Sequence, residues 1–186
     1  MSSYHSDVTG KAEYLWQQYV TTDGGDAHEL AWALSTAGVS YSRRGEHCAA
    51  IESSELAVRM LRDRIDHGVG TQDDEAALPY LLANLAGAHD DAHHPAETLA
   101  TWREAVERQR HVRDVAPYED DDWVLADILH GYAAAAMNLG FDSEARASLR
   151  EAEELLAPVF ARRPRFAREL MDQIAATRTT WESKQR

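Results

Sequence analysis

Cysteine is nearly absent from this chain of 186 residues, in which Cys48 is the only one. A single cysteine excludes an internal disulfide and favours a reducing compartment. Long apolar runs are also missing, and none reaches the roughly 18 residues that suggest a membrane-spanning helix. Residues 1–10 lack the basic and apolar segments of a signal peptide. Together these absences predict a cytoplasmic protein.

Basic residues are few: 19 Lys and Arg stand against 32 Asp and Glu, which gives a formal net charge of −13. Nucleic acids and anionic membranes bind basic surfaces, so we expect neither as a partner. The charge favours a basic or neutral protein or peptide instead. The chain also has no HExxH or CxxC motif and no glycine-rich phosphate loop. We therefore expect no cofactor, no metal and no catalysis.

Residues that break helices are sparse, with five prolines and ten glycines, whereas the strong helix former alanine occurs 31 times. No segment alternates apolar and polar residues as a half-buried strand would. The sequence therefore predicts an all-α fold of about eight antiparallel helices, over residues 4–20, 27–44, 47–67, 73–92, 95–115, 120–139, 142–160 and 164–183.

Three apolar ladders repeat along the chain. They start at Leu30, Leu78 and Leu125, which are 48 and 47 residues apart, and each continues in steps of 4, 3 and 4 residues. Such steps mark one face of a helix, and a second helix follows each ladder at a constant offset. Small residues recur where paired helices would touch, and these are Gly38, Ala86, Ala133, Ala57, Ala105 and Ala152.

The ladders predict one domain over residues 1–186. It comprises an N-terminal helix and linker (1–26), three helix pairs (27–67, 73–115 and 120–160) and a C-terminal capping helix (164–186). Gly45, His93 and Gly140 occupy the same place between paired helices, where a left-handed residue ends a helix. Helix-start caps are expected at Asp26 with Glu29 and at Thr71 with Asp74.

The repeat resembles the tetratricopeptide repeat. The residues that carry the likeness are Leu34, Gly38, Tyr41, Gly45, Ala50 and Ala57, then Leu82, Leu85, Ala86, Trp102, Ala105 and Val106, then Leu129, Ala133, Gly140, Ala145, Leu149 and Ala152. The resemblance implies a right-handed α-α superhelix, a solenoid of stacked helix pairs. The period departs from the family's usual repeat of about 34 residues, so both helices of each pair must be longer.

In such a solenoid the first helix of each pair lines a concave groove. The expected groove residues combine aromatic anchors with small and polar side chains, a combination suited to a peptide; they are Trp32, Ser35, Val39, Arg43, Tyr80, Asn84, Asp90, Asp91, Asp127, His130 and Asn138. Asn84 either satisfies a peptide backbone or bonds a neighbouring helix. Trp32 and Tyr80 are either anchors or half-buried packing residues. Asp90, Asp91 and Asp127 either attract a partner's Lys or Arg or are simply solvated.

The leading functional hypothesis is a non-catalytic protein–protein interaction module that binds a peptide or a partner surface in this groove. The alternative is a regulator that responds to a small ligand or signalling peptide. A weaker alternative is a metal-dependent enzyme that uses the cluster from His89 to His94, whose histidines partly share a helix face. Homodimerisation through the end helices is a further hypothesis, because solenoid ends expose apolar faces.

Overall fold

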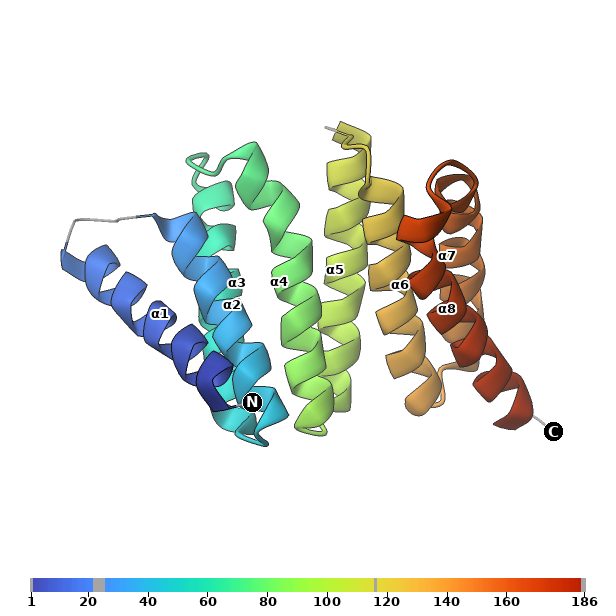
Figure 1. Cartoon of the computed structure of the whole chain (residues 1–186), viewed down its shortest axis with the longest axis horizontal. Helices are drawn as coiled ribbons and strands as arrows, with labels where there is room; N and C mark the ends of the chain where they lie inside the picture. Colours follow the sequence, from blue (N-terminus) through green and yellow to red (C-terminus); the bar gives the residue numbers. More distant parts are fainter. Residues whose placement is uncertain (1, 22–25, 116, 185–186) are drawn as a thin grey trace. The chain divides into compact units, whose positions relative to one another are not determined.

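The computed structural model describes residues 2–21, 26–115 and 117–184. Within these ranges all regular structure is helical, which confirms the predicted all-α class (Figure 1). The predicted linker before residue 27 lies mostly outside the described residues. The part of the chain that the structure describes forms the helices α1 (Ser2–Thr21), α2 (Ala27–Arg43), α3 (His47–Asp66), α4 (Gln72–Asp91), α5 (Pro95–Val115), α6 (Asp121–Asn138), α7 (Asp142–Arg162) and α8 (Pro164–Lys184).

The chain forms two compact units, which divide within α5. Unit 1 is Met1–Thr101 and unit 2 is Trp102–Arg186. Each unit is described by itself below, and the expectation of one domain over residues 1–186 stays a prediction. No described helix is both long and apolar enough to cross a bilayer.

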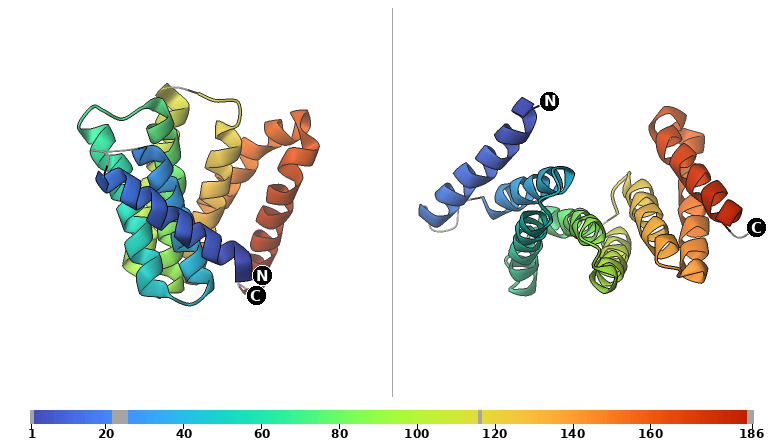
Figure 2. Two further views of the ribbon diagram at one scale, coloured as in Figure 1. Left: turned by 60° about the vertical axis from the view of Figure 1, so that its left-hand side comes forward. Right: turned by 90° about the horizontal axis from the view of Figure 1, so that it is seen from below.

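Unit 1 is built on the hairpin of α2 and α3. Helix α4 packs against both of them, and α1 crosses α2 (Figure 2). Leucines fill the interior: Leu30, Leu78 and Leu82 of the predicted ladders and Leu61 of α3 are at most 1% exposed. A smaller apolar cluster around Ala12, Ala33 and Ala37 joins α1 to α2.

Unit 2 is built on the hairpin of α6 and α7, and α8 packs chiefly on α7 and less on α6 (Figure 2). Its centre holds Leu125, Leu129, Leu156 and Ile174, each at most 1% exposed. In both units the small residues expected at helix contacts are buried. Ala57, Ala86, Ala105, Ala133 and Ala152 are fully covered, as the requirement for close helix approach predicts.

The predicted left-handed turns are confirmed at all three equivalent positions. Gly45 has φ +76°, Gly140 has φ +80° and His93 has φ +60°, and His93 is the one non-glycine residue with positive φ among those the structure describes. A side chain in this conformation costs about 1–2 kcal/mol, whereas glycine adopts it without strain.

Substitution of His93 by glycine is therefore expected to raise the free energy of unfolding by about 0.5 kcal/mol, because relief of the strained turn exceeds the extra entropy of the unfolded glycine. Chemical denaturation measures the change. Gly45→Ala is the opposite control and should destabilise the protein. A loss of stability in His93→Gly would mean that the exposed imidazole contributes more than the strain costs.

The predicted helix-start caps are also confirmed. Asp26 accepts a hydrogen bond from the Glu29 backbone N–H at 3.0 Å. Thr71 and Asp74 cap each other reciprocally, because each side chain accepts the backbone N–H of the other. These local bonds fix where α2 and α4 begin.

Candidate functional site

Residues predicted to line a groove come together on adjacent helices of unit 1. Trp32 and Tyr80 hold the same register position in consecutive repeats, two residues after Leu30 and Leu78. Their ring centroids lie 6.0 Å apart at an interplanar angle of 46°, and both side chains are half-buried. We call the surface formed by Trp32, Val39, Tyr80 and Asn84 the α2–α4 face.

Asn84 bonds the neighbouring helix, which was one of the two outcomes expected for it. Its Nδ2 donates to Ser35 Oγ over 2.9 Å. Ser35 is fully buried under this bond, so it supports Asn84 and does not present its own side chain to a partner. The Asn84 amide oxygen accepts no hydrogen bond from the described residues and remains available on the half-buried face.

The charged residues predicted for this groove lie near the end of the α2–α4 face. Asp91 is exposed at the last residue of α4, and its carboxylate accepts a hydrogen bond from the Ser42 hydroxyl of α2. Asp90 beside it is half-buried, and Arg43, the last residue of α2, is exposed. The two carboxylates therefore lie about three helical turns beyond Tyr80 on α4, and that of Asp91 is oriented by its bond to Ser42 of α2.

A buried carboxylate at the other end of the face holds Trp32 in place. The Trp32 indole N–H donates to His28 Nε2 at 3.1 Å, and His28 Nδ1 lies 2.9 Å from Asp74. Because an indole N–H can only donate, His28 Nε2 accepts, and its proton sits on Nδ1 and is donated to Asp74. Arg64 Nε donates to the other Asp74 oxygen at 3.1 Å.

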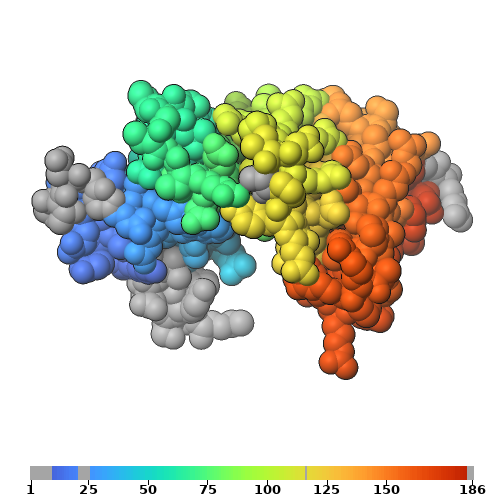
Figure 3. Space-filling model, turned by 90° about the horizontal axis from the view of Figure 1, so that it is seen from above, coloured from blue at the N-terminus to red at the C-terminus, as the bar shows by residue number. Residues whose placement is uncertain are grey.

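Asp74 keeps its charge although it is 0% exposed. Burial alone would raise the pKa of Asp74 and is the largest single influence, but hydrogen bonds from the Thr71 backbone, His28 and Arg64 together hold it below its ordinary value. Figure 3 looks onto the end of unit 1 where α4 (green) begins. The carboxylate thus ties α2, α3 and α4 together beneath Trp32.

This anchoring role was not predicted, although the sequence carries a signal for it. Asp26, Asp74 and Asp121 all lie four residues before a ladder leucine. Asp121 repeats the pattern in unit 2, where its carboxylate accepts the Tyr118 backbone N–H and the side-chain amide of Gln109 at 3.0 Å. An aspartate repeated at one register position is thus a sign of a structural carboxylate at a helix start.

Three predicted site residues lie on α6 in unit 2. Asp127 is half-buried, has no hydrogen bond or ion pair with the described residues, and burial raises its pKa. His130 Nε2 lies 2.9 Å from Thr177 Oγ1 of α8, and burial lowers the pKa of its imidazole. Asn138 is exposed at the last residue of α6. Asp127 is therefore a partly desolvated carboxylate without a compensating cation.

A scan of protein-family models and a search of curated proteins both find nothing similar to the chain. The likeness to tetratricopeptide repeats stays a prediction.

Of the histidines between residues 89 and 94, His89 lies in the core and His93 lies in the turn after α4. His89 is 7% exposed, and its ring lies 5.8 Å from that of His94. Burial lowers the pKa of the His89 imidazole, and this effect outweighs the negative charge of Glu55, which raises it. Among the described residues, no three His, Cys, Asp or Glu side chains are grouped so as to hold a metal ion.

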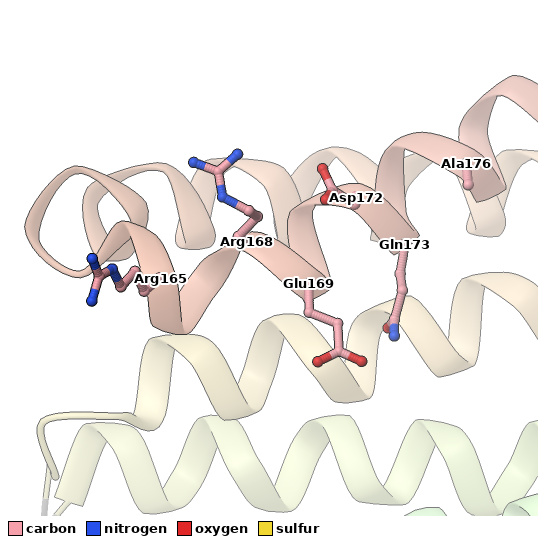
Figure 4. A pocket seen from close by; sticks show the side chains of 6 residues that line it. All are labelled: Arg165, Arg168, Glu169, Asp172, Gln173 and Ala176. Atoms are coloured by element: carbon pink, nitrogen blue, oxygen red, sulfur yellow. The ribbon is translucent and has the colours of Figure 1, made fainter.

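A hollow of about 530 Å³ opens along α8 in unit 2 (Figure 4). We call it the α8 hollow. Arg163, which precedes α8, does not line the hollow; it pairs with Asp120, and its guanidinium lies 4.1 Å from the centroid of the Phe166 ring. The lining residues are Arg165, Arg168, Glu169, Asp172, Gln173 and Ala176.

Proposed function

We propose that this protein is a non-catalytic interaction module that binds a peptide or a partner surface on the first helices of its helix pairs, with the α2–α4 face as the principal contact. The observation that carries the proposal is the half-buried pair of Trp32 and Tyr80, whose rings lie 6.0 Å apart on neighbouring helices. Large, rigid rings give much buried area for little lost entropy, which is why they dominate binding surfaces.

The fixed orientation of Trp32 supports this function further. Its indole N–H is bonded to His28, which in turn bonds the buried Asp74. A side chain held in its bound geometry loses less freedom when a partner arrives. The amide oxygen of Asn84 adds an acceptor for a partner's backbone N–H, one turn from Tyr80 on the same helix.

We also propose that the helix pairs form a right-handed superhelix of the tetratricopeptide type. Three features support this proposal: the 47–48-residue repeat of the ladders, the left-handed residue at equivalent turns, and the buried small residues at equivalent helix contacts. Such arrays present the first helix of each pair to their partners. The carboxylates of Asp90 and Asp91 at the end of α4 favour a basic partner.

A peptide-binding assay tests the function. Wild-type protein is applied to an immobilised library of random peptides, and the affinity of the peptides it selects is measured in solution. Replacement of both Trp32 and Tyr80 by alanine should weaken these peptides about tenfold or more, because it removes the aromatic area of the face.

Phe141→Ala is the matched control, since Phe141 is an aromatic residue 43% exposed at the turn before α7 and belongs to neither α2 nor α4. It should leave the affinity unchanged, and circular dichroism should show all variants folded. If the double variant binds the selected peptides as tightly as the wild type, the α2–α4 face is not the binding surface.

A further inference from the structure

A chain of hydrogen bonds from three helices lies beneath the α2–α4 face. The Trp32 indole N–H donates to His28 Nε2 at 3.1 Å, and His28 Nδ1 lies 2.9 Å from Asp74 Oδ1. Arg64 Nε donates to Asp74 Oδ2 at 3.1 Å. The Asp74 side chain is 0% exposed, whereas that of His28 is 33% exposed. Water can therefore exchange protons with His28, although the carboxylate next to it is enclosed.

These bonds require a neutral His28 imidazole. An indole nitrogen donates and does not accept, so Nε2 of His28 accepts with its lone pair, and the proton on Nδ1 is donated to Asp74. An imidazolium carries a proton on both nitrogens. Its Nδ1–H would keep the bond to Asp74 and gain strength from the charge. Its Nε2–H, however, would point at the Trp32 N–H, so two donors would face each other and this bond would be lost.

The charges around His28 come from α1, α3 and α4, the helices that pack against α2. Asp74 of α4 favours the imidazolium, whereas Arg64 of α3, which binds the same carboxylate, opposes it. From α1, Lys11 pairs at 3.0 Å with Glu29, the residue next to His28. The first turn of α2 also opposes a cation, because it is the positive end of the helix dipole. Opposing charges thus surround an imidazole, the group whose charge ordinarily changes between about pH 5 and 8.

Loss of the bond to Trp32 would reach the proposed binding surface directly. The Trp32 ring lies 6.0 Å from that of Tyr80, and both side chains are half-buried on the α2–α4 face. Without its bond to His28, the indole regains freedom that a bound peptide must remove again. A peptide that needs the oriented indole therefore binds the neutral imidazole state better, and protonation and peptide binding oppose each other.

We propose that acid regulates the α2–α4 face through His28: a proton taken up from water at Nε2 breaks the bond to Trp32 and weakens the binding of a peptide. The protein then holds its peptide near neutral pH and releases it on acidification. This inference rests on the proposed function, because it assigns a regulation to the same surface. It also gives Asp74 a second role, since its carboxylate keeps the Nδ1 proton in place while Nε2 changes its state.

NMR of the isotope-labelled full chain tests the switch without a peptide. The scalar coupling between Trp32 Nε1 and His28 Nε2 reports their hydrogen bond directly. It should be present at about pH 8 and lost at about pH 5.5. The Trp32 indole signal, assigned by its absence in Trp32→Phe, should shift with the same midpoint as the His28 imidazole. A coupling that is absent in the neutral state, or that persists after His28 is protonated, overturns the switch.

The peptide arm uses peptides that were selected in the peptide-binding assay and contain no histidine. Wild-type affinity should fall about fivefold between about pH 7.5 and about pH 5.5, as expected for the loss of one hydrogen bond. His28→Gln, which cannot take up the proton, should change less than about twofold over this range. His111→Gln is the matched control, because His111 is an exposed histidine of α5, and it should keep the wild-type fall. Circular dichroism should show every variant folded at both pH values.

The two arms separate this inference from the proposed function. Loss of the coupling in acid supports the switch even if no peptide binds the α2–α4 face, a result that contradicts the proposed function alone. Peptides that depend on Trp32 and Tyr80 but bind the wild type equally well at both pH values overturn the acid regulation and leave the proposed function intact. A pH dependence that persists unchanged in His28→Gln also overturns it, because another group would then take up the proton.

Discussion

Replacement of Asp74 by alanine is expected to lower the free energy of unfolding by about 3 kcal/mol. The carboxylate is 0% exposed, and both of its oxygens are occupied by His28, Arg64 and the Thr71 backbone. Removal of one partner from a buried ion pair costs about 3–5 kcal/mol, and a lost helix cap about 1 kcal/mol. His28 and Arg64 are about one-third exposed, so water partly replaces the lost carboxylate, and this lowers the expected total to about 3 kcal/mol.

Urea unfolding followed by circular dichroism measures this loss. Asp73→Ala is the matched control, since Asp73 is an exposed carboxylate in the same first turn of α4. It should cost no more than about 0.5 kcal/mol through the helix dipole. Equal losses in the two variants would contradict the role assigned to Asp74.

The same carboxylate predicts the direction of a pH effect. The pKa of Asp74 in the folded protein lies below its ordinary value, because its hydrogen bonds outweigh burial. A group with a depressed folded pKa stabilises the protein fully above its unfolded pKa of about 4, and this contribution fades as the pH falls through the folded pKa. The stability gap between wild type and Asp74→Asn should therefore be constant near neutral pH and shrink below about pH 4.

Features determined by nearby residues could be predicted from the sequence. The three ladders place apolar side chains on one helix face, so the helices follow from local spacing alone. The turns at Gly45, His93 and Gly140, and the reciprocal cap of Thr71 and Asp74, are likewise decided within a few residues. In each case a left-handed residue or a side-chain acceptor satisfies backbone groups of its own helix end.

The interactions between distant residues could be predicted only in part. Trp32 and Tyr80 meet because the repeat gives them equivalent positions on adjacent helices. The anchor of Trp32 was missed because it joins residues from three helices, and His28 is 46 residues from Asp74 in sequence. Single-helix periodicity indicates which face is buried, but not which polar group of one helix meets which group of another.

Gly38→Ala is expected to lower the free energy of unfolding by about 2 kcal/mol, although alanine is the better helix former. An added Cβ would lie 2.2 Å from Ser54 Oγ and 3.0 Å from the backbone oxygen of Ala50 on the facing helix. Ser54 is 1% exposed, so its hydroxyl has little space into which it can turn. The small residue at this repeat position therefore sets how closely α2 and α3 approach.

Ser54→Ala tests whether the Ser54 hydroxyl is the group that the Cβ added at Gly38 would strike. The Ser54 hydroxyl is buried and has no hydrogen-bond partner among the described residues, so its loss alone should change stability little. In the double variant Gly38→Ala, Ser54→Ala the hydroxyl no longer blocks the added Cβ, so more than half of the stability lost through Gly38→Ala should be regained.

Gly87→Ala is the control for helix propensity, because nothing lies within 4 Å of its added Cβ. It should stabilise α4 by about 0.5–1 kcal/mol. Additive effects of the Gly38 and Ser54 substitutions in urea unfolding would show that the two side chains do not compete for one space.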